Sequence, residues 1–204
     1  MDRRAHWECV YTTKRSDEVS WYQAEPTRSL ELLRAAGAGP DTTIVDVGGG
    51  DSTLVDAVVA ERLGRMTVLD VSAAALARAR ERLGERENGV TWIEADVTRA
   101  ELPEGAYDVW HDRAAFHFLT DAEERARYAA LAARAVRPGG RLMIATFAAD
   151  GPTRCSGLEV ARYSPEELAR ELGDAFELER GFGDVHVTPA GKEQRFTVAV
   201  LRRR

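Results

Sequence analysis

The stretch DVGGGDST (residues 46–53) places three consecutive glycines between two apolar segments. It overlaps TTIVDV (42–47), whose β-branched residues favour a strand, and it precedes LVDAVV (54–59), an apolar run with helical periodicity. A glycine-rich turn between a strand and a helix lets the backbone approach a bound cofactor closely. The stretch therefore predicts the first strand of an α/β sheet, with a cofactor site at its carboxyl end.

Strand-like and helix-like segments alternate along the rest of the chain. Ser72 is placed to cap a helix over 73–83, and the capping-box pattern from Thr120 to Glu123 opens a helix that stops before Pro138. Strict alternation implies right-handed crossovers, so it predicts a doubly wound α/β fold with a mostly parallel sheet and helices on both faces. The predicted strands of the alternating part are 42–47, 66–71, 90–95, 107–111 and 141–147.

The two ends of the chain depart from this alternation. Residues 26–36 have a helical pattern ended by Gly37, and we expect this segment to close over the cofactor. Near the other end, Ser164 opens a capped helix with a proline in its first turn. Strand-like runs at 176–187 and 195–201 follow, and the connection between them is short enough only for antiparallel neighbours. We therefore expect the sheet to end in a hairpin.

The composition is typical of one globular unit of 204 residues. We predict a single domain over 1–204, with an N-terminal lid or helical segment over 1–40 and a core over 41–204. The net charge of −6 and the pI near 5.4 argue against affinity for phosphate backbones, so nucleic acid is not an expected partner.

Membrane, metal and disulfide chemistry are also not expected. No apolar run approaches the roughly 20 residues that span a bilayer, and no apolar segment follows residues 1–5, so we expect a cytoplasmic protein. Cys9 and Cys155 are far apart and are expected to be reduced thiols. No His or Cys spacing resembles a zinc site, so we predict no metal.

The glycine turn itself separates two classes of cofactor. A dinucleotide favours three glycines at fixed spacing, but Thr53 stands at the third position, and Asp51 brings a negative charge that would repel a pyrophosphate. S-adenosylmethionine carries an ammonium and a sulfonium and no phosphate. Asp46 is placed to accept a hydrogen bond from that ammonium. The turn therefore favours S-adenosylmethionine.

Two further acids end the next strands. Asp70, in TVLDVS, stands where a carboxylate accepts both ribose hydroxyls, and Asp96, in WIEADVT, stands where a side chain reaches the adenine amino group. Either acid alone is more often a solvated strand end or a helix cap. Together with Asp46 they mark the carboxyl ends of three successive parallel strands, which line one crevice.

The ordered set DVGGGDS, VLDVS, EADV, YDVWHDRAAFHFL and RPGGRLMIATF, with the terminal strand pair, resembles class I S-adenosylmethionine-dependent methyltransferases over residues 40–204. The resemblance implies a Rossmann-like sheet of seven strands whose last strand is antiparallel. It also implies a cofactor-binding set at the strand ends, formed by Asp46, Gly48, Gly49, Gly50, Asp70, Val71, Asp96 and Val97.

Several segments resemble the thiopurine and thiol methyltransferase branch of that family: WECVY, WYQAEP, WHDRAA, RARYAALAARAVRPGG and DGPTRCSGLEVARYSPEEL. Tyr22 replaces a histidine of that branch, the glycine turn is the ordinary class I form, and CSGL has no firm counterpart. The resemblance implies that Arg113 lies near the methyl acceptor. It also implies lid or cofactor contacts for Trp7, Tyr11, Trp21 and Gln23. Trp7, Trp21 and Tyr22 could equally anchor a helix on the sheet edge.

Methyl transfer from a sulfonium is an in-line displacement, in which the enzyme mainly aligns the reacting atoms and excludes water. The candidate catalytic residues are Arg113, Asp112 and His111 at the fourth strand end, with Tyr22. Phe116 and His117 follow in the same segment. Arg113 and Asp112 equally fit a structural ion pair, and a lone histidine is more often structural than catalytic.

The function expected from these observations is methyl transfer to a small-molecule acceptor, a thiol or another sulfur, oxygen or nitrogen nucleophile. The acceptor would enter beneath a lid formed by the first 25 residues and the loop 148–163. The nearest rival function is that of a protein-lysine N-methyltransferase, favoured by an exposed acidic rim, whereas an enclosed aromatic pocket favours a small acceptor. A nicotinamide-dependent oxidoreductase and a catalytically silent cofactor-binding module are two further candidate functions. The sequence does not indicate the oligomeric state.

Overall fold

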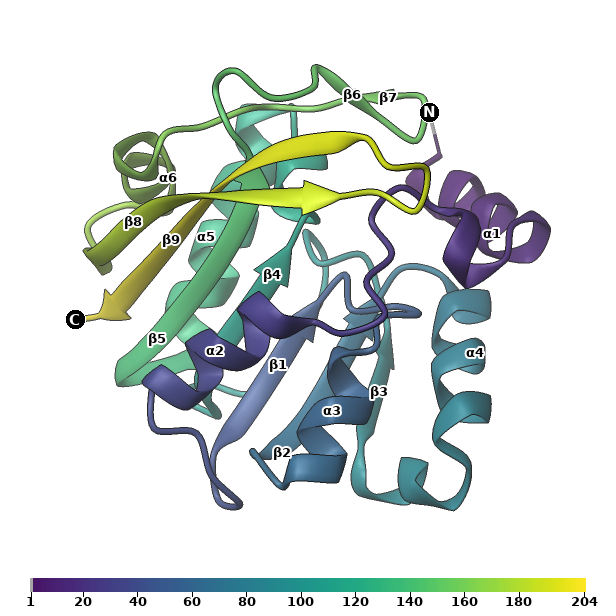
Figure 1. The fold of residues 1–204 in the computed structure, drawn as a ribbon. Coiled ribbons are helices and arrows are strands. Elements are labelled where there is room, and N and C mark those ends of the chain that lie inside the picture. Colours follow the sequence, from purple (N-terminus) through teal and green to yellow (C-terminus); the bar gives the residue numbers. More distant parts are fainter. Residues whose placement is uncertain (1) are drawn as a thin grey trace.

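The computed structural model describes residues 2–204. It contains a seven-stranded sheet with the order β3-β2-β1-β4-β5-β9-β8, in which β9 is antiparallel to both of its neighbours (Figure 1). This confirms the predicted mixed sheet and its closing hairpin. The strands are β1 (Thr43–Val47), β2 (Arg65–Asp70), β3 (Thr91–Glu94), β4 (Tyr107–Arg113), β5 (Val136–Phe147), β8 (Phe176–Val187) and β9 (Glu193–Arg203).

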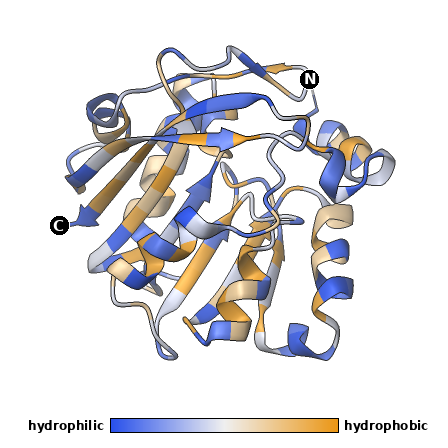
Figure 2. Ribbon diagram, viewed as in Figure 1, coloured by the Kyte–Doolittle hydropathy of each residue, from blue (hydrophilic) through white to orange (hydrophobic). Residues whose placement is uncertain are grey.

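Helices cover both faces of the sheet, as the doubly wound prediction requires. The helices α2 (Thr27–Ala35), α3 (Leu54–Glu61) and α4 (Ala73–Leu83) pack on one face, and α5 (Ala122–Ala135) and α6 (Pro165–Leu172) pack on the other (Figure 1). Successive residues of a strand point to opposite faces of the sheet, so each strand contributes to both hydrophobic cores. In β1, Ile44 packs with α2, α3 and α4, and Val45 packs with α5 and α6. The strands β1 and β2 are accordingly mostly hydrophobic (Figure 2).

Local caps fix several helix ends where the sequence predicts them. The Ser72 side chain accepts a hydrogen bond from Ala75 N, and Ser164 forms a complete capping box with Glu167. At α5 the prediction is off by one residue, because the side chain of Asp121, and not Thr120, accepts from Glu123 N and Glu124 N. Asp is the better cap here because its carboxylate accepts two bonds at a positive helix end.

The N-terminal segment differs from its prediction. The helix α2 does not close over a cofactor site, because its Leu30 and Leu33 are buried in the sheet core beside α3. An additional helix, α1 (Arg3–Thr13), lies instead near the carboxyl ends of β2 and β3 and contacts α4 (Figure 1). The loop after β5 carries a small hairpin of β6 (Arg154–Cys155) and β7 (Leu158–Glu159).

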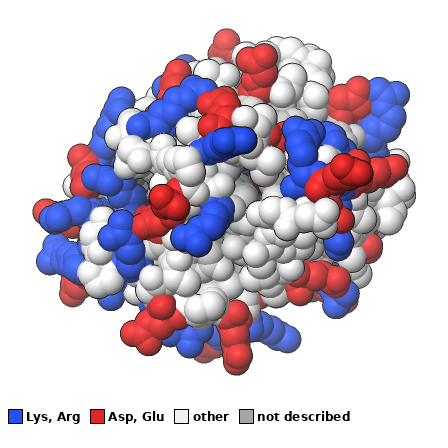
Figure 3. Space-filling model, turned by 90° about the horizontal axis from the view of Figure 1, so that it is seen from below, with Lys and Arg blue, Asp and Glu red and all other residues white. Residues whose placement is uncertain are grey.

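Acidic and basic side chains are interspersed on the face of the molecule seen from below (Figure 3). Several acidic and basic side chains of the molecule are paired across elements, such as Arg141 with Glu179 and Arg202 with Glu177. Within residues 2–204, no helix is long and apolar enough to cross a membrane.

Candidate cofactor and acceptor site

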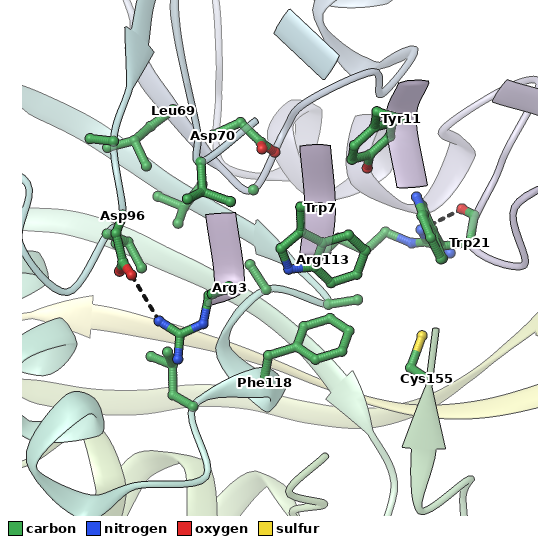
Figure 4. Close-up of a pocket in the computed structure, with 18 residues that line it drawn as sticks. Arg3, Trp7, Tyr11, Trp21, Leu69, Asp70, Asp96, Arg113, Phe118 and Cys155 are labelled. Carbon is green, nitrogen blue, oxygen red and sulfur yellow. Dashed lines mark hydrogen bonds and ion pairs between the residues drawn. The ribbon is translucent and has the colours of Figure 1, made fainter. Parts of the chain in front are cut away.

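A pocket at the carboxyl ends of the central strands, here called the main pocket, lies beneath α1 (Figure 4). A second pocket, here called the turn pocket, adjoins it around the glycine turn and shares Tyr11, Trp21, Gly48 and Arg113 with it. Two adjacent pockets thus lie at the strand ends. The predicted site residues that line the main pocket are Trp7, Tyr11, Trp21, Gly48, Asp70, Val71, Asp96, Val97 and Arg113. Those that line the turn pocket are Tyr11, Trp21, Tyr22, Gln23, Asp46, Gly48, Gly49 and Arg113.

The glycine turn is packed too closely for side chains. Gly48 has a φ of +69°, and a Cβ on it would lie 2.5 Å from the Cβ of Ala115. A Cβ on Gly50 would lie 2.7 Å from Asp70 Oδ2, so Gly50 backs directly onto this carboxylate without lining either pocket. The glycines therefore bring the turn backbone against both neighbouring strand ends.

The negative charge of Asp51, which in the sequence analysis argues against a bound pyrophosphate, is compensated by neighbouring arginines. Its carboxylate pairs with Arg82 and lies 3.6 Å from Arg78, and it accepts a hydrogen bond from Ser16. The argument from Asp51 is weakened accordingly. Thr53 stays in the place of a third glycine, and its hydroxyl donates to the Gln23 carbonyl at 3.0 Å.

Asp70 is almost fully buried at the end of β2, and its Oδ1 accepts from Ser72 N at 2.8 Å. Burial first, and then the negative charges of Asp46 and Glu8, raise the pKa of its carboxyl to about 7 against the lowering effect of the backbone hydrogen bonds from Ser72 and Val71. This strand end can therefore bind donors, such as a pair of hydroxyl groups, that favour the ionised form.

Asp96 lies two residues after the end of the third strand at Glu94, in a different environment. Its Oδ1 accepts from Thr98 N at 2.9 Å, and its Oδ2 accepts from Arg3 Nη1 at 2.9 Å. Partial burial raises its pKa, but the hydrogen bonds from Thr98 and Arg3 outweigh burial and leave the pKa below its usual value. Asp96 is therefore ionised at neutral pH.

An aromatic cluster covers the main pocket (Figure 4). The ring of Trp7 lies 4.9 Å from Phe118 and 5.5 Å from Trp21, centroid to centroid, in edge-to-face contacts. Glu8 fixes the middle of α1, because its carboxylate accepts from Ser72 Oγ at 2.7 Å and from Ala74 N at 3.3 Å. The aromatic residues thus both anchor α1 and line the pocket.

Arg113 points into the space where the pockets meet (Figure 4). Its Nη1 donates to the Trp21 carbonyl at 3.0 Å, and its guanidinium lies 5.4 Å from the centre of the Phe196 ring. Burial lowers its pKa to about 10, so the group remains charged at neutral pH. No carboxylate among residues 2–204 forms an ion pair with it, so the proposed pair with Asp112 does not form.

The other candidate catalytic residues of this strand face away from the main pocket. Asp112 accepts hydrogen bonds from Ala115 N at 2.9 Å and from the Tyr128 hydroxyl at 2.7 Å, and burial raises its pKa to about 6. His111 is buried on the opposite face, between Asp46 and Ser29. Neither side chain therefore lines the main pocket.

The segment after β4 is only partly as expected. Phe116 is in the core, and His117 is buried beside Phe147, with burial lowering its pKa to about 3. Phe118, which the sequence did not single out, lines the main pocket. Cys155 lines it as well, and burial raises the pKa of its thiol to about 11, so the thiol is neutral. Arg3 also lines the main pocket. It was not predicted as a site residue, because one arginine among many carries no sequence signal.

Comparisons with known protein families and curated proteins both identify similarity to methyltransferases. Residues 44–140, a little under half of the chain, match the methyltransferase domain family. An uncharacterized methyltransferase of Mycobacterium tuberculosis is 35% identical over 105 residues, which are 51% of this chain and 50% of that protein. The chain thus spans about half the length of the curated relatives it matches.

Two solved structures share the fold over nearly the whole chain. The Burkholderia thailandensis 1,6-didemethyltoxoflavin-N1-methyltransferase, with 1,6-didemethyltoxoflavin and S-adenosylhomocysteine bound, has 20% identity and a TM-score of 0.72, covering 98% of this chain and 86% of that one. A protein solved in work on the conversion of a disulfide bond into a thioacetal group during echinomycin biosynthesis has 18% identity and a TM-score of 0.78, covering 97% and 90%. At these identities the similarity is one of fold.

Proposed function

We propose that the protein, which carries a methyltransferase domain over residues 44–140 in a class I methyltransferase fold, transfers the methyl group of S-adenosylmethionine to a small-molecule acceptor. The observation that carries the proposal is the convergence of three strand-end acids and a side-chain-free turn on two adjacent pockets. S-adenosylmethionine has one donor group for each acid: its ammonium, its pair of ribose hydroxyls and its adenine amino group.

The cofactor roles follow from the position of each acid. Asp46, in the turn pocket, would accept from the ammonium, and Asp70 would accept from the ribose hydroxyls. Asp96 has one Oδ2 lone pair beyond its bond to Arg3 and would accept from the adenine amino group. The remaining members of the set would pack on the cofactor from above and below: Gly48, Gly49, Val71, Val97, Trp7, Tyr11, Trp21 and Gln23.

The acceptor would lie beside Arg113, Cys155 and Phe118, within the main pocket. S-adenosylmethionine supplies an electrophilic methyl carbon: the acceptor lone pair forms the new bond to it as the sulfur–methyl bond breaks. The protein's part is to align the two molecules and to exclude water, which the aromatic cover provides. Arg113 would hold the acceptor by its free N–H groups.

A small acceptor agrees better with this pocket than a protein side chain does. The lining is mostly apolar and aromatic, and α1 covers it, which is the feature that favours a small acceptor over a protein-lysine substrate. The Burkholderia enzyme methylates a small heterocycle, and the echinomycin study concerns sulfur chemistry. Together with the resemblance to the thiol branch, this supports testing thiols first.

Calorimetry with S-adenosylmethionine, S-adenosylhomocysteine and NAD tests the cofactor. We expect binding of the first two and none of NAD; tight NAD binding with neither of the others would refute the proposal. Transfer of a labelled methyl group to a panel of thiols, phenols, amines and purified proteins then tests the acceptor. Labelling of proteins alone would refute a small acceptor.

A further inference from the structure

Asp46 and His111 lie opposite each other on the parallel strands β1 and β4. His111 Nδ1 lies 2.7 Å from Asp46 Oδ1, and His111 Nε2 lies 2.8 Å from Ser29 Oγ of α2. None of the three residues is more than 5% exposed. The imidazole is therefore held at both nitrogens, by partners from two different elements.

The second oxygen of the Asp46 carboxylate faces the glycine turn. A Cβ built on Gly49 would lie 2.5 Å from Asp46 Oδ2, so this oxygen lies directly against the turn backbone. Within residues 2–204, Oδ2 accepts no hydrogen bond, and Asp46 lines the turn pocket. One oxygen is thus occupied by His111, and the other has no hydrogen-bond partner among residues 2–204, in a side chain that lines the turn pocket.

We propose that His111 is a positioning residue for the ammonium group of the cofactor, acting through Asp46. A neutral imidazole that donates from Nδ1 to Asp46 accepts the Ser29 hydroxyl at Nε2, so α2 fixes the ring and the ring fixes the carboxylate. A carboxylate locked in this way presents Oδ2 in one orientation. The inference rests on the proposed function, because it presupposes that Asp46 meets the cofactor.

In hydrolases the same connectivity of Ser, His and Asp activates the serine as a nucleophile, with the histidine as its general base. Here the Ser29 side chain is buried between α2 and the sheet, with 4% of the residue exposed, and it does not line the main pocket. The contacts therefore serve Asp46 and not an exposed nucleophile.

A matched pair of substitutions separates the two ends of the imidazole. His111→Asn keeps a donor near the Nδ1 position and so retains the bond to Asp46. His111→Gln places its amide near the Nε2 position and so retains the contact with Ser29 only. Both are polar and close in size to histidine, and thermal unfolding verifies that each variant folds.

The two probes are S-adenosylhomocysteine and 5′-methylthioadenosine, which shares the adenine and ribose but has no ammonium. For His111→Gln we expect the Kd of S-adenosylhomocysteine to rise about tenfold to a hundredfold, the range for a hydrogen bond to a charged group, and that of 5′-methylthioadenosine to change less than about twofold. For His111→Asn we expect both to stay within about threefold of the wild type.

Three results would overturn the inference: equal losses for both probes, equal losses in both variants, or no loss in His111→Gln. In each of these the wild type still binds S-adenosylhomocysteine, so the proposed function stands. If the wild type binds neither probe, the proposed function fails and the inference fails with it.

Discussion

Arg3 Nη1 donates to Asp96 Oδ2 at 2.9 Å, which ties the first turn of α1 to the end of β3. The same guanidinium donates through Nη2 to Glu124 Oε2 of α5 at 2.6 Å. Arg3 also lines the main pocket, so the pair closes the pocket at the position proposed for the adenine (Figure 4). We therefore expect release of a cofactor from beneath α1 to break this contact.

Arg3→Ala should speed dissociation of S-adenosylhomocysteine by about tenfold while changing the free energy of unfolding by less than about 1 kcal/mol, because a partly exposed ion pair contributes little to stability. Stopped-flow release checks the rate. Arg4→Ala is the matched control, since Arg4 pairs with Glu94 from the next position of the same helix and does not line the main pocket. Equal rates for both variants would contradict a closing role for Arg3.

Asp70 predicts how cofactor affinity depends on pH. Its pKa is near 7 in the unliganded protein, whereas ribose hydroxyls require the ionised carboxylate, so binding below pH 7 must release a proton. The Kd of 5′-methylthioadenosine should therefore weaken by up to about tenfold per pH unit between pH 7 and pH 5.5. Calorimetry over pH 5.5–7.5 measures the slope, and Asp70→Asn should bind weakly with a flat profile. A flat profile in the wild type would remove Asp70 from the ribose site.

The same pKa has the opposite consequence for stability without ligand. Because the folded pKa lies above the usual 3.8, the folded state retains a proton that the unfolded state has lost between about pH 4 and pH 7. This contribution to stability is present at low pH and is lost as the pH rises through 7. The wild-type Tm should therefore fall relative to that of Asp70→Asn over this interval.

Gly48→Ala should damage the turn itself. The new Cβ would lie 2.5 Å from Ala115 Cβ, and the φ of +69° is unfavourable for a side chain. Together these should lower the free energy of unfolding by about 2–4 kcal/mol and abolish cofactor binding. Gly89→Ala is the control, because its φ is not in the left-handed region and a Cβ there would meet no atom of the described residues within 4 Å. Denaturant unfolding measures both, and equal stabilities would show that the turn tolerates a side chain.

The alternation of strands and helices, the closing hairpin and the strand-end acids could be predicted because hydrophobic period, glycine turn and cap residues act locally. The faces to which the side chains of β4 point could not be predicted. Strand alternation sends His111 and Asp112 to opposite faces, but which face meets the pocket depends on α2 and α5, which pack from distant parts of the chain. Helix α1 carried a weak signal, since Trp7, Val10 and Tyr11 have helical spacing in an otherwise polar segment. Arg3 had no signal at all, because its partners are 93 and 121 residues away.

Arg113 should act on the acceptor more than on the cofactor. It is a charged group without an acidic partner among residues 2–204, and it keeps N–H groups free beside Cys155 at the meeting point of the two pockets. Arg113→Ala should lower methyl transfer to the best acceptor of the panel by about tenfold to a hundredfold, the range for a lost hydrogen bond to a charged group, with the Kd of S-adenosylhomocysteine within about threefold.

Arg195→Ala provides the control for this arginine, because the Arg195 side chain forms, within residues 2–204, only an exposed pair with Asp150. Its transfer rate should equal that of the wild type. An equal loss of transfer and of S-adenosylhomocysteine affinity in Arg113→Ala would instead assign the guanidinium to the carboxylate of the cofactor, since Arg113 also lines the turn pocket beside Asp46. Arg113→Lys separates charge from geometry: a point charge retains attraction to an anion but not the planar set of donors, so transfer should recover only in part.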